Sequence, residues 1–145
     1  MSGLINSAFG LLVAIAAIIT LGLTGNLFSA SPFVIAAQVL AVGLSVWARR
    51  SFPDGTFRVT AAPGGESIIT RGPYRMIRHP MYAAVLIFIW AAVLSHRSLL
   101  TVLIGIVVTS VIVARVIAEE KLLRAHYPDY REYTKSTRAL IPYIV

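Results

Sequence analysis

The sequence predicts an all-α polytopic membrane protein, with four transmembrane helices, a cytoplasmic connecting loop and a C-terminal helical tail, in one domain spanning residues 1–145. Two observations lead to this prediction. Hydrophobic residues make up 57% of the chain and charged residues only 13%, about half of the roughly 25% that is typical of soluble domains. Residues 1–48 contain no Asp, Glu, Lys, Arg or His. A soluble fold would need a charged face within that stretch, so a bilayer is the simpler environment.

Four apolar stretches suit membrane-spanning helices, which need about 20 residues, or fewer where the bilayer thins. They cover approximately residues 4–23, 32–48, 81–94 and 99–117. Thr24-Gly25-Asn26 is expected to end the first stretch, and Pro32 suits the first turn of the second. The polar residues 95–98 form a tight turn between the last two.

Basic residues indicate the orientation. Arginines gather in the connection between the second and third stretches, at Arg49, Arg50, Arg58, Arg71, Arg75 and Arg78. Basic residues also follow the fourth stretch, at Lys121, Arg124, Arg131, Lys135 and Arg138. Because Lys and Arg concentrate on the cytoplasmic side, we expect both termini in the cytoplasm and the protein in a bacterial or archaeal inner membrane. The same rule explains the net charge of +7, so no nucleic-acid partner is expected.

Composition also excludes several kinds of site. The chain has no cysteine, which rules out disulfides, thiolate metal sites and cysteine nucleophiles. His79, His96 and His126 lie far apart without metal-ligand spacing, so no metal site is predicted. The first stretch lacks a basic flank and is too long for the apolar part of a signal peptide, and we expect it to be retained as a span. Within the second stretch, Gln38 is expected to bond a neighbouring helix.

Polar residues crowd the start of the third apolar stretch. Pro80 suits the first turn of a helix. Arg78 and His79 would then lie at its N-terminus, where free amides and the helix dipole favour an anion. Ionisable clusters at a membrane edge are costly and indicate a functional site. Arg71 and Arg75, by contrast, could equally extend toward lipid headgroups.

Two later segments carry further polar residues. Arg115 and Glu119 share a helical face where the helix of the fourth stretch continues past the membrane edge, as do Glu120 and Arg124. Taken alone, these pairs are also typical of a solvated helix end. Farther on, Tyr130 and Tyr133 are three positions apart and occupy one face of a short helix. All six tyrosines follow residue 70, whereas an interfacial aromatic belt would serve both membrane faces.

These motifs follow one another in order along the chain: Gly72-Pro73-Tyr74-Arg75, Arg78-His79-Pro80-x-Tyr82, Glu119-Glu120-x-x-Leu123, Tyr127-Pro128-x-Tyr130-x-x-Tyr133 and Ile141-Pro142. In this order they resemble the isoprenylcysteine carboxyl methyltransferase family, part of a wider group of integral-membrane methyltransferases that includes phospholipid N-methyltransferases. The resemblance runs from about Gly65 to the C-terminus, and Ala84 stands where the family usually has Gly. The first two spans resemble the family only in being apolar.

The resemblance implies S-adenosylmethionine as methyl donor, in a pocket at the cytoplasmic membrane edge that a lipophilic or lipid acceptor reaches from the bilayer. The pocket would be formed by segments 65–82 and 115–142. By carry-over, the cofactor would contact Arg78, His79, Pro80, Tyr82, Glu119, Glu120, Tyr127, Tyr130 and Tyr133. The leading activity implied is O-methylation of a lipophilic carboxylate.

The residue types suit this donor. Arg78 and His79 suit its carboxylate, the glutamates its amine or ribose diol, and tyrosine rings its sulfonium or adenine. A carboxylate acceptor would need a cation to orient it, and Arg115 or Arg138 could serve. A protonated amine acceptor would need a base, and Glu119 could serve.

Three alternatives stay open at this point. The acceptor could be the amine of a phospholipid or of a small molecule. The chain could be a four-span transporter, although such proteins usually need an ionisable residue at the membrane midplane, and the first two spans offer none. It could also keep the scaffold of the family without activity. The oligomeric state is left open.

Overall fold

The described residues form five α-helices and one short 3-10 helix. The computed structural model describes residues 2–53 and 67–141, with side chains from residue 9 onward. In chain order the helices are α1 Ser2–Leu23, α2 Pro32–Arg50, η1 Gly72–Arg75, α3 Pro80–His96, α4 Leu99–His126 and α5 Tyr130–Ser136. The described part contains no strand, only an isolated bridge between Ile77 and Arg138. The all-α prediction is therefore confirmed for these residues. The motif residues Gly65 and Pro142, and Arg58, lie outside them.

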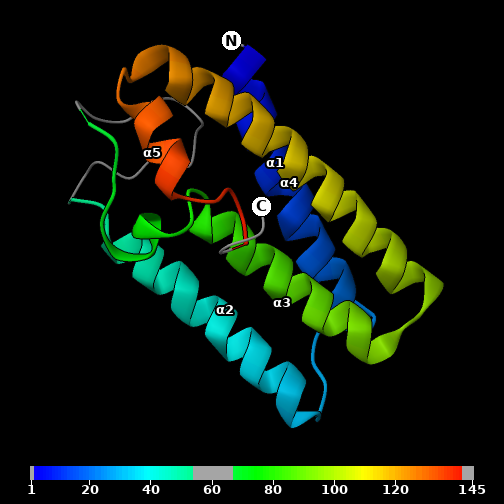
Figure 1. Ribbon diagram of the computed structural model, residues 1–145. Coiled ribbons are helices and arrows are strands. Elements are labelled where there is room, and N and C mark those ends of the chain that lie inside the picture. Colours follow the sequence, from blue (N-terminus) through cyan, green and yellow to red (C-terminus); the bar gives the residue numbers. More distant parts are fainter. Residues whose placement is uncertain (1, 54–66, 142–145) are drawn as a thin grey trace.

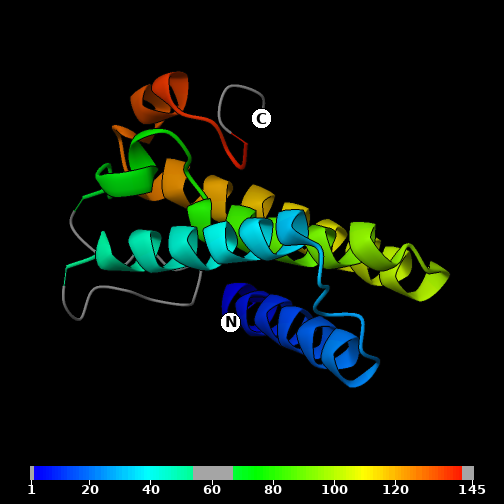
Figure 2. The ribbon, with the colours of Figure 1, turned by 90° about the horizontal axis from the view of Figure 1, so that it is seen from below.

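The long helices pack side by side, as Figure 1 shows. α3 contacts both α2 and α4, and α1 packs on α4. Figure 2 shows α1 beneath the layer that the other three long helices form. α5 and η1 lie together at one end of this bundle, opposite the α3–α4 turn. The ends of three separate polar segments are thereby brought to one end of the molecule.

A small apolar core joins α1, α3 and α4. Leu21, Ile89, Val93 and Val108 are almost fully buried within it. Gly105 on α4 allows close approach, because a Cβ there would lie 3.2 Å from the side chain of Val93. Outside the core, many large apolar side chains are exposed. A surface of this kind suits a lipid environment better than water.

The predicted helix breaks are confirmed. α1 ends at Leu23, and the following Gly25 has a positive φ of 71°. This conformation lets the Asn26 amide donate to the Leu21 carbonyl at 2.7 Å. Pro32 and Pro80 each begin a helix, as predicted. The buried Gln38 donates to the backbone carbonyl of Leu27, 2.8 Å away, in the connection before α2 rather than to a helix.

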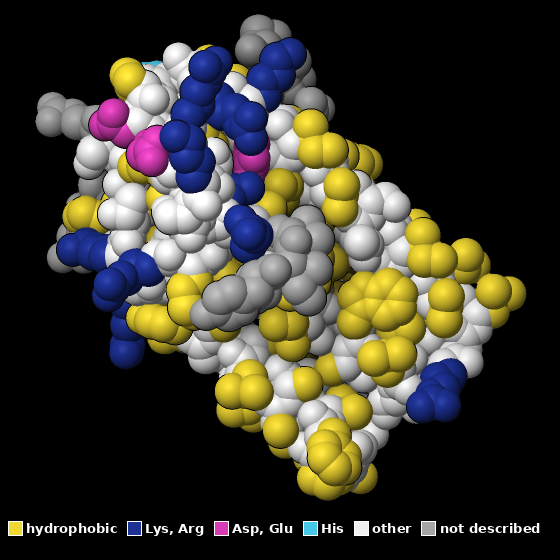
Figure 3. All heavy atoms as spheres, viewed as in Figure 1, with side chains coloured by type: hydrophobic (Ala, Val, Ile, Leu, Met, Phe, Trp, Pro, Cys, Tyr) yellow, Lys and Arg dark blue, Asp and Glu magenta, His cyan; other side chains and the backbone are white. Residues whose placement is uncertain are grey.

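Helix length and composition agree with a membrane protein. α2 and α4 are each long and apolar enough to cross a bilayer. The apolar parts Phe9–Leu23 of α1 and Pro80–His96 of α3 are shorter. Four spans therefore stay a prediction. Figure 3 shows Lys and Arg side chains gathered at the end of the bundle that carries η1 and α5, while hydrophobic side chains dominate the remainder of that face.

Candidate active site at the polar end of the bundle

The C-terminal segment pairs with the backbone just before α3. The amide of Arg138 donates to the Met76 carbonyl at 3.0 Å, and the Arg138 carbonyl accepts from Arg78 at 2.8 Å. The His79 amide donates to the Ala139 carbonyl at 3.0 Å. These bonds extend the bridge of Ile77 and Arg138. They fix the tail beside the polar motif at the start of α3.

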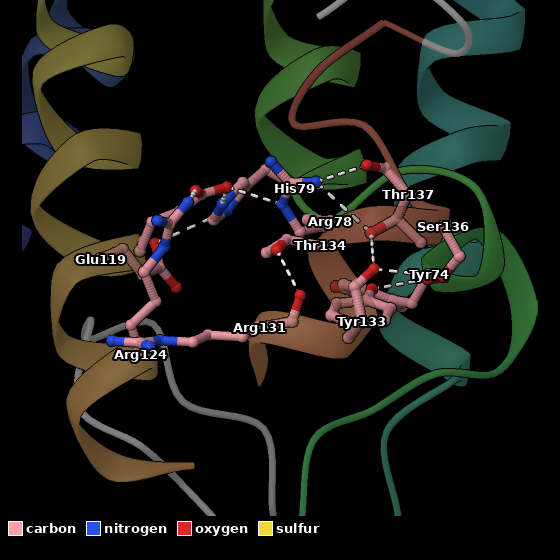
Figure 4. A network of polar contacts seen from close by, with 11 residues as sticks. Tyr74, Arg78, His79, Glu119, Arg124, Arg131, Tyr133, Thr134, Ser136 and Thr137 are labelled. Carbon is pink, nitrogen blue, oxygen red and sulfur yellow. Dashed lines mark hydrogen bonds and ion pairs between the residues drawn. The ribbon is translucent and has the colours of Figure 1, made fainter. Parts of the chain in front are cut away.

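Arg78 is the centre of the resulting network (Figure 4). Its Nε donates to Glu120 Oε1 at 2.7 Å, and its Nη1 donates to the Thr137 carbonyl at 2.5 Å. Arg124 contacts the other Glu120 oxygen at 3.2 Å. Only 11% of the Arg78 side chain and 13% of the Glu120 side chain are exposed. Arg78 therefore joins α3, α4 and the C-terminal segment through charge-assisted hydrogen bonds.

His79 lies between the two glutamates. The residue is buried, with its Nε2 3.4 Å from Glu120 Oε1 and its Nδ1 4.0 Å from Glu119 Oε2. Its ring stacks on that of Tyr82, with centroids 5.7 Å apart. The Tyr82 hydroxyl donates to Glu119 Oε2 at 2.9 Å. The pattern predicted an anion at the start of α3, and Glu120 of the chain itself supplies one.

The Glu120 carboxylate stays ionised in this setting. Burial acts to raise its pKa, but the close contacts with His79 and Arg78, together with their charge, outweigh burial and lower the pKa to about 2. Glu120 therefore offers acceptor oxygens at physiological pH. A ligand amine or hydroxyl could bond to them without a change of protonation.

Three tyrosines flank the charged network. The Tyr133 hydroxyl donates to the Tyr74 carbonyl at 2.6 Å, and the Tyr133 ring packs edge-on against Tyr130 at 5.8 Å. Burial raises the pKa of Tyr133 to about 12, partly opposed by the charge of Arg78. Burial, followed by the charge of Glu120, also raises the pKa of Tyr130. These phenols therefore remain neutral donors.

Tyr130 has an additional feature. It is 2% exposed, and its hydroxyl has no hydrogen-bond partner among the described residues. A buried hydroxyl left without a partner is costly. Because the charges of Glu120 and Arg78 both act on this group, a polar ligand atom at this position would complete the network.

The remaining predicted site residues lie at different distances from the network. The Arg115 guanidinium sits over the Tyr82 ring, 5.2 Å from its centroid. Pro80 is buried at the start of α3, and Tyr127 is buried at the end of α4. Arg138 contributes backbone bonds, but the residue itself is exposed.

An open hollow of about 500 Å³ lies beside this network, between η1 and α5. Arg75, Tyr133 and Thr137 are among the residues that border it. Thr137 also links it to the network, because its carbonyl accepts from Arg78. The volume falls within the usual range for small-molecule sites, about 300–1,000 Å³.

Sequence reasoning missed Thr137 and the carbonyl of Tyr74. Both act mainly through backbone oxygens, which every residue carries and which give no residue-type signal, although the Thr137 hydroxyl also accepts from Arg78 at 3.4 Å. The described residues contain no cluster of His, Cys, Asp or Glu that could hold a metal ion.

Comparison with known proteins supports an integral-membrane methyltransferase. A search of curated proteins returned no match to this chain. A family model described as phospholipid methyltransferase matches residues 1–130. This match supports the wider group to which the motifs pointed, without singling out the isoprenylcysteine carboxyl methyltransferases within it. Since it covers most of the 145 residues, the chain belongs to the phospholipid methyltransferase family.

Proposed function

We propose that this protein is a membrane-embedded methyltransferase that uses S-adenosylmethionine and methylates a lipophilic acceptor at the polar end of the bundle. One observation carries the proposal: segments around residues 78–82, 119–120 and 130–137 converge on one network of buried polar groups. The family match gives this network a methyl-transfer context. The final part of the network, after residue 130, lies beyond the matched region.

The residues of the network fit such a cofactor. When bound, S-adenosylmethionine supplies a methyl group on a sulfonium centre. Glu119 and Glu120 offer acceptors for its amine or ribose hydroxyls, and Arg78 offers donors for its carboxylate. The Tyr130 hydroxyl, which has no partner among the described residues, could supply a further polar contact to the cofactor. Methyl transfer is a direct displacement, so correct positioning by these groups supplies much of the rate enhancement.

Two observations favour different acceptors. The name of the matched family favours the amine of a phospholipid. Such an amine must lose a proton, and Glu119, beside Tyr82 at the end of α4, is the candidate base. Arg115, above the Tyr82 ring, instead favours an acceptor carboxylate that a cation would orient, as in isoprenylcysteine methylation. We propose the phospholipid amine as the first acceptor to test.

The proposed orientation follows from the distribution of charge. The polar end carries the arginines around η1 and the basic residues after α4, whereas the α3–α4 turn carries Arg97. With α1 to α4 as four spans, the polar end and both termini would face the cytoplasm. A lipid acceptor would then enter from the inner leaflet.

Cofactor binding tests the site directly. Purified protein in detergent should bind S-adenosylmethionine or S-adenosylhomocysteine saturably in calorimetry. His79→Ala and Glu120→Ala should each weaken that binding at least about tenfold, the loss expected for a charge-assisted contact. His96→Ala is the matched control, because His96 ends the same helix and bonds locally to the Ala92 carbonyl. Undiminished binding in both site variants would remove this assignment.

A second experiment identifies the acceptor. Membrane lipid extract is incubated with the protein and a donor carrying a labelled methyl group. Label that survives mild alkali on a lipid amine supports N-methylation, whereas label released as methanol reveals a methyl ester. Absence of any labelled product from the lipid extract, despite cofactor binding, would contradict the proposed activity.

A further inference from the structure

Gly10 on α1 lies directly against the side chain of Arg115 on α4. A Cβ placed on Gly10 would collide with Cδ of Arg115, and would lie 2.9 Å from its Nη1 and 3.2 Å from its Cγ. The three atoms nearest to that position all belong to Arg115. A side chain at position 10 would therefore require the Arg115 side chain to move.

Arg115 connects this contact to the candidate active site. Its guanidinium lies over the Tyr82 ring, 5.2 Å from the centroid. The Tyr82 hydroxyl in turn donates to Glu119 at 2.9 Å. A continuous set of contacts thus leads from Gly10 through Arg115 and Tyr82 to Glu119.

We infer that Gly10 is a positioning residue: by lacking a side chain, it lets α1 hold Arg115 over Tyr82 and so fixes the direction of the Glu119 carboxylate. The inference assigns the first helix a part in the site, although that helix carries no ionisable residue. The effect of Gly10 on turnover rests on the proposed methyl transfer, whereas the contact between Gly10 and Arg115 is independent of it.

Other glycines provide a matched control. A Cβ on Gly22, on the same helix, would meet the Leu27 side chain at 3.8 Å, which is ordinary contact. A Cβ on Gly43 of α2 would meet nothing within 4 Å. Since Ala is a better helix former than Gly, alanine at Gly22 or Gly43 should leave the protein as stable or make it more stable. Alanine at Gly10 should displace Arg115.

The first experiment is a double-mutant cycle on thermal unfolding in mild detergent. Gly10→Ala should lower Tm by several degrees, whereas Gly22→Ala should not. In an Arg115→Ala background, Gly10→Ala should no longer lower Tm. Should Gly10→Ala alone fail to fold, recovery of folded protein in the double variant supports the contact, and failure of the double variant overturns it. Additive effects on Tm also overturn the inference, whatever the protein catalyses.

The second experiment measures positioning rather than stability. With labelled donor and the acceptor pool, Gly10→Ala should lower kcat/KM about ten- to hundredfold, the cost of misplacing a catalytic group slightly. In a Tyr82→Phe background, where the bond to Glu119 is already lost, it should lower kcat/KM less than about threefold. A purely structural role would give the same loss in both backgrounds and would overturn the inference. Absence of turnover in the wild-type protein would contradict the proposed function but leave the unfolding cycle intact.

Discussion

The two ends of the helix bundle use polar groups in opposite ways. At the polar end, Arg78 reaches Glu120 across 42 positions in sequence and Thr137 across 59. At the opposite end, Arg97 donates to a carbonyl three residues earlier, and Ser98 caps α4 through Thr101 three residues later. The contacts at the polar end join segments that are distant in sequence, whereas those at the opposite end only cap the ends of α3 and α4.

This difference separates a candidate site from ordinary helix termination. Local caps such as that of Ser98 are expected wherever a helix begins. The long-range pair of Arg78 and Glu120 is also largely buried, and buried charge is costly unless it is fully paired. The polar end accepts that cost while leaving the buried Tyr130 hydroxyl without a partner among the described residues. A buried ionic network that still leaves a polar group unpaired is typical of a ligand site rather than of a purely structural contact.

Replacing Arg78, the cation at the centre of the network, should have the largest effect on stability and on cofactor binding. Arg78→Ala leaves Glu120 and the Thr137 carbonyl without their Arg78 donors. We expect the free energy of unfolding to fall by about 2–4 kcal/mol, and cofactor binding to weaken at least about tenfold in calorimetry. Arg97→Ala, at the opposite end, is the control and should change cofactor binding less than about twofold. Equal effects on binding would show that the two ends do not differ in function.

The next effect concerns pH and comes from Glu120. The folded-state pKa of this carboxyl is lowered to about 2 from an ordinary 4.5. Its stabilising contribution is therefore complete above about pH 4.5 and is lost as pH falls toward 2. At neutral pH, Glu120→Gln should destabilise the protein by on the order of 1–2 kcal/mol, because solvent partly screens the pair. Thermal unfolding from pH 7 to pH 3 should show the difference from wild type shrinking below pH 4.5. A constant difference would mean that His79 and Arg78 do not lower this pKa.

The sequence predicted the helices well because their signals are local. Pro32, Pro80 and the Thr24–Asn26 break mark helix boundaries by their own backbone preferences. The observed ends of α1 to α3 lie close to those of the predicted stretches, whereas α4 continues to His126, beyond the fourth stretch. Helical spacing placed Arg115 and Glu119 on one face, and both in fact contact Tyr82.

The sequence could not predict how the site is assembled. The tail is held beside Arg78 by backbone groups of Arg138 and Ala139, and amides carry no residue-type signal. Nor could the pattern show that Arg78 would pair with Glu120 of the chain, because both also suit a ligand. The contribution of Gly10 depends on the packing of α1 against α4, which composition alone does not fix.

A smaller effect is expected at the opposite end of the bundle. Ser98→Ala removes the side-chain acceptor of the capping box at the start of α4. The loss should destabilise the protein by about 1 kcal/mol and leave the affinity for S-adenosylhomocysteine unchanged. Thermal unfolding and calorimetry on the same sample would test both parts. Weaker cofactor binding in this variant would show that the two ends are coupled through α4, contrary to the separation argued above.

The smallest effect should come from an ion pair that lies at the polar end but makes only a local contact. Lys135 and Glu132 meet at 2.7 Å on α5, with 72% and 77% of their side chains exposed. Exposed pairs of this kind contribute little, so Lys135→Ala should change the free energy of unfolding by less than about 0.5 kcal/mol. Because Lys135 also borders the open hollow, its effect on calorimetric cofactor affinity is the more informative measurement. Unchanged affinity would place the cofactor on the buried network alone, whereas a severalfold loss would extend the binding site into the hollow.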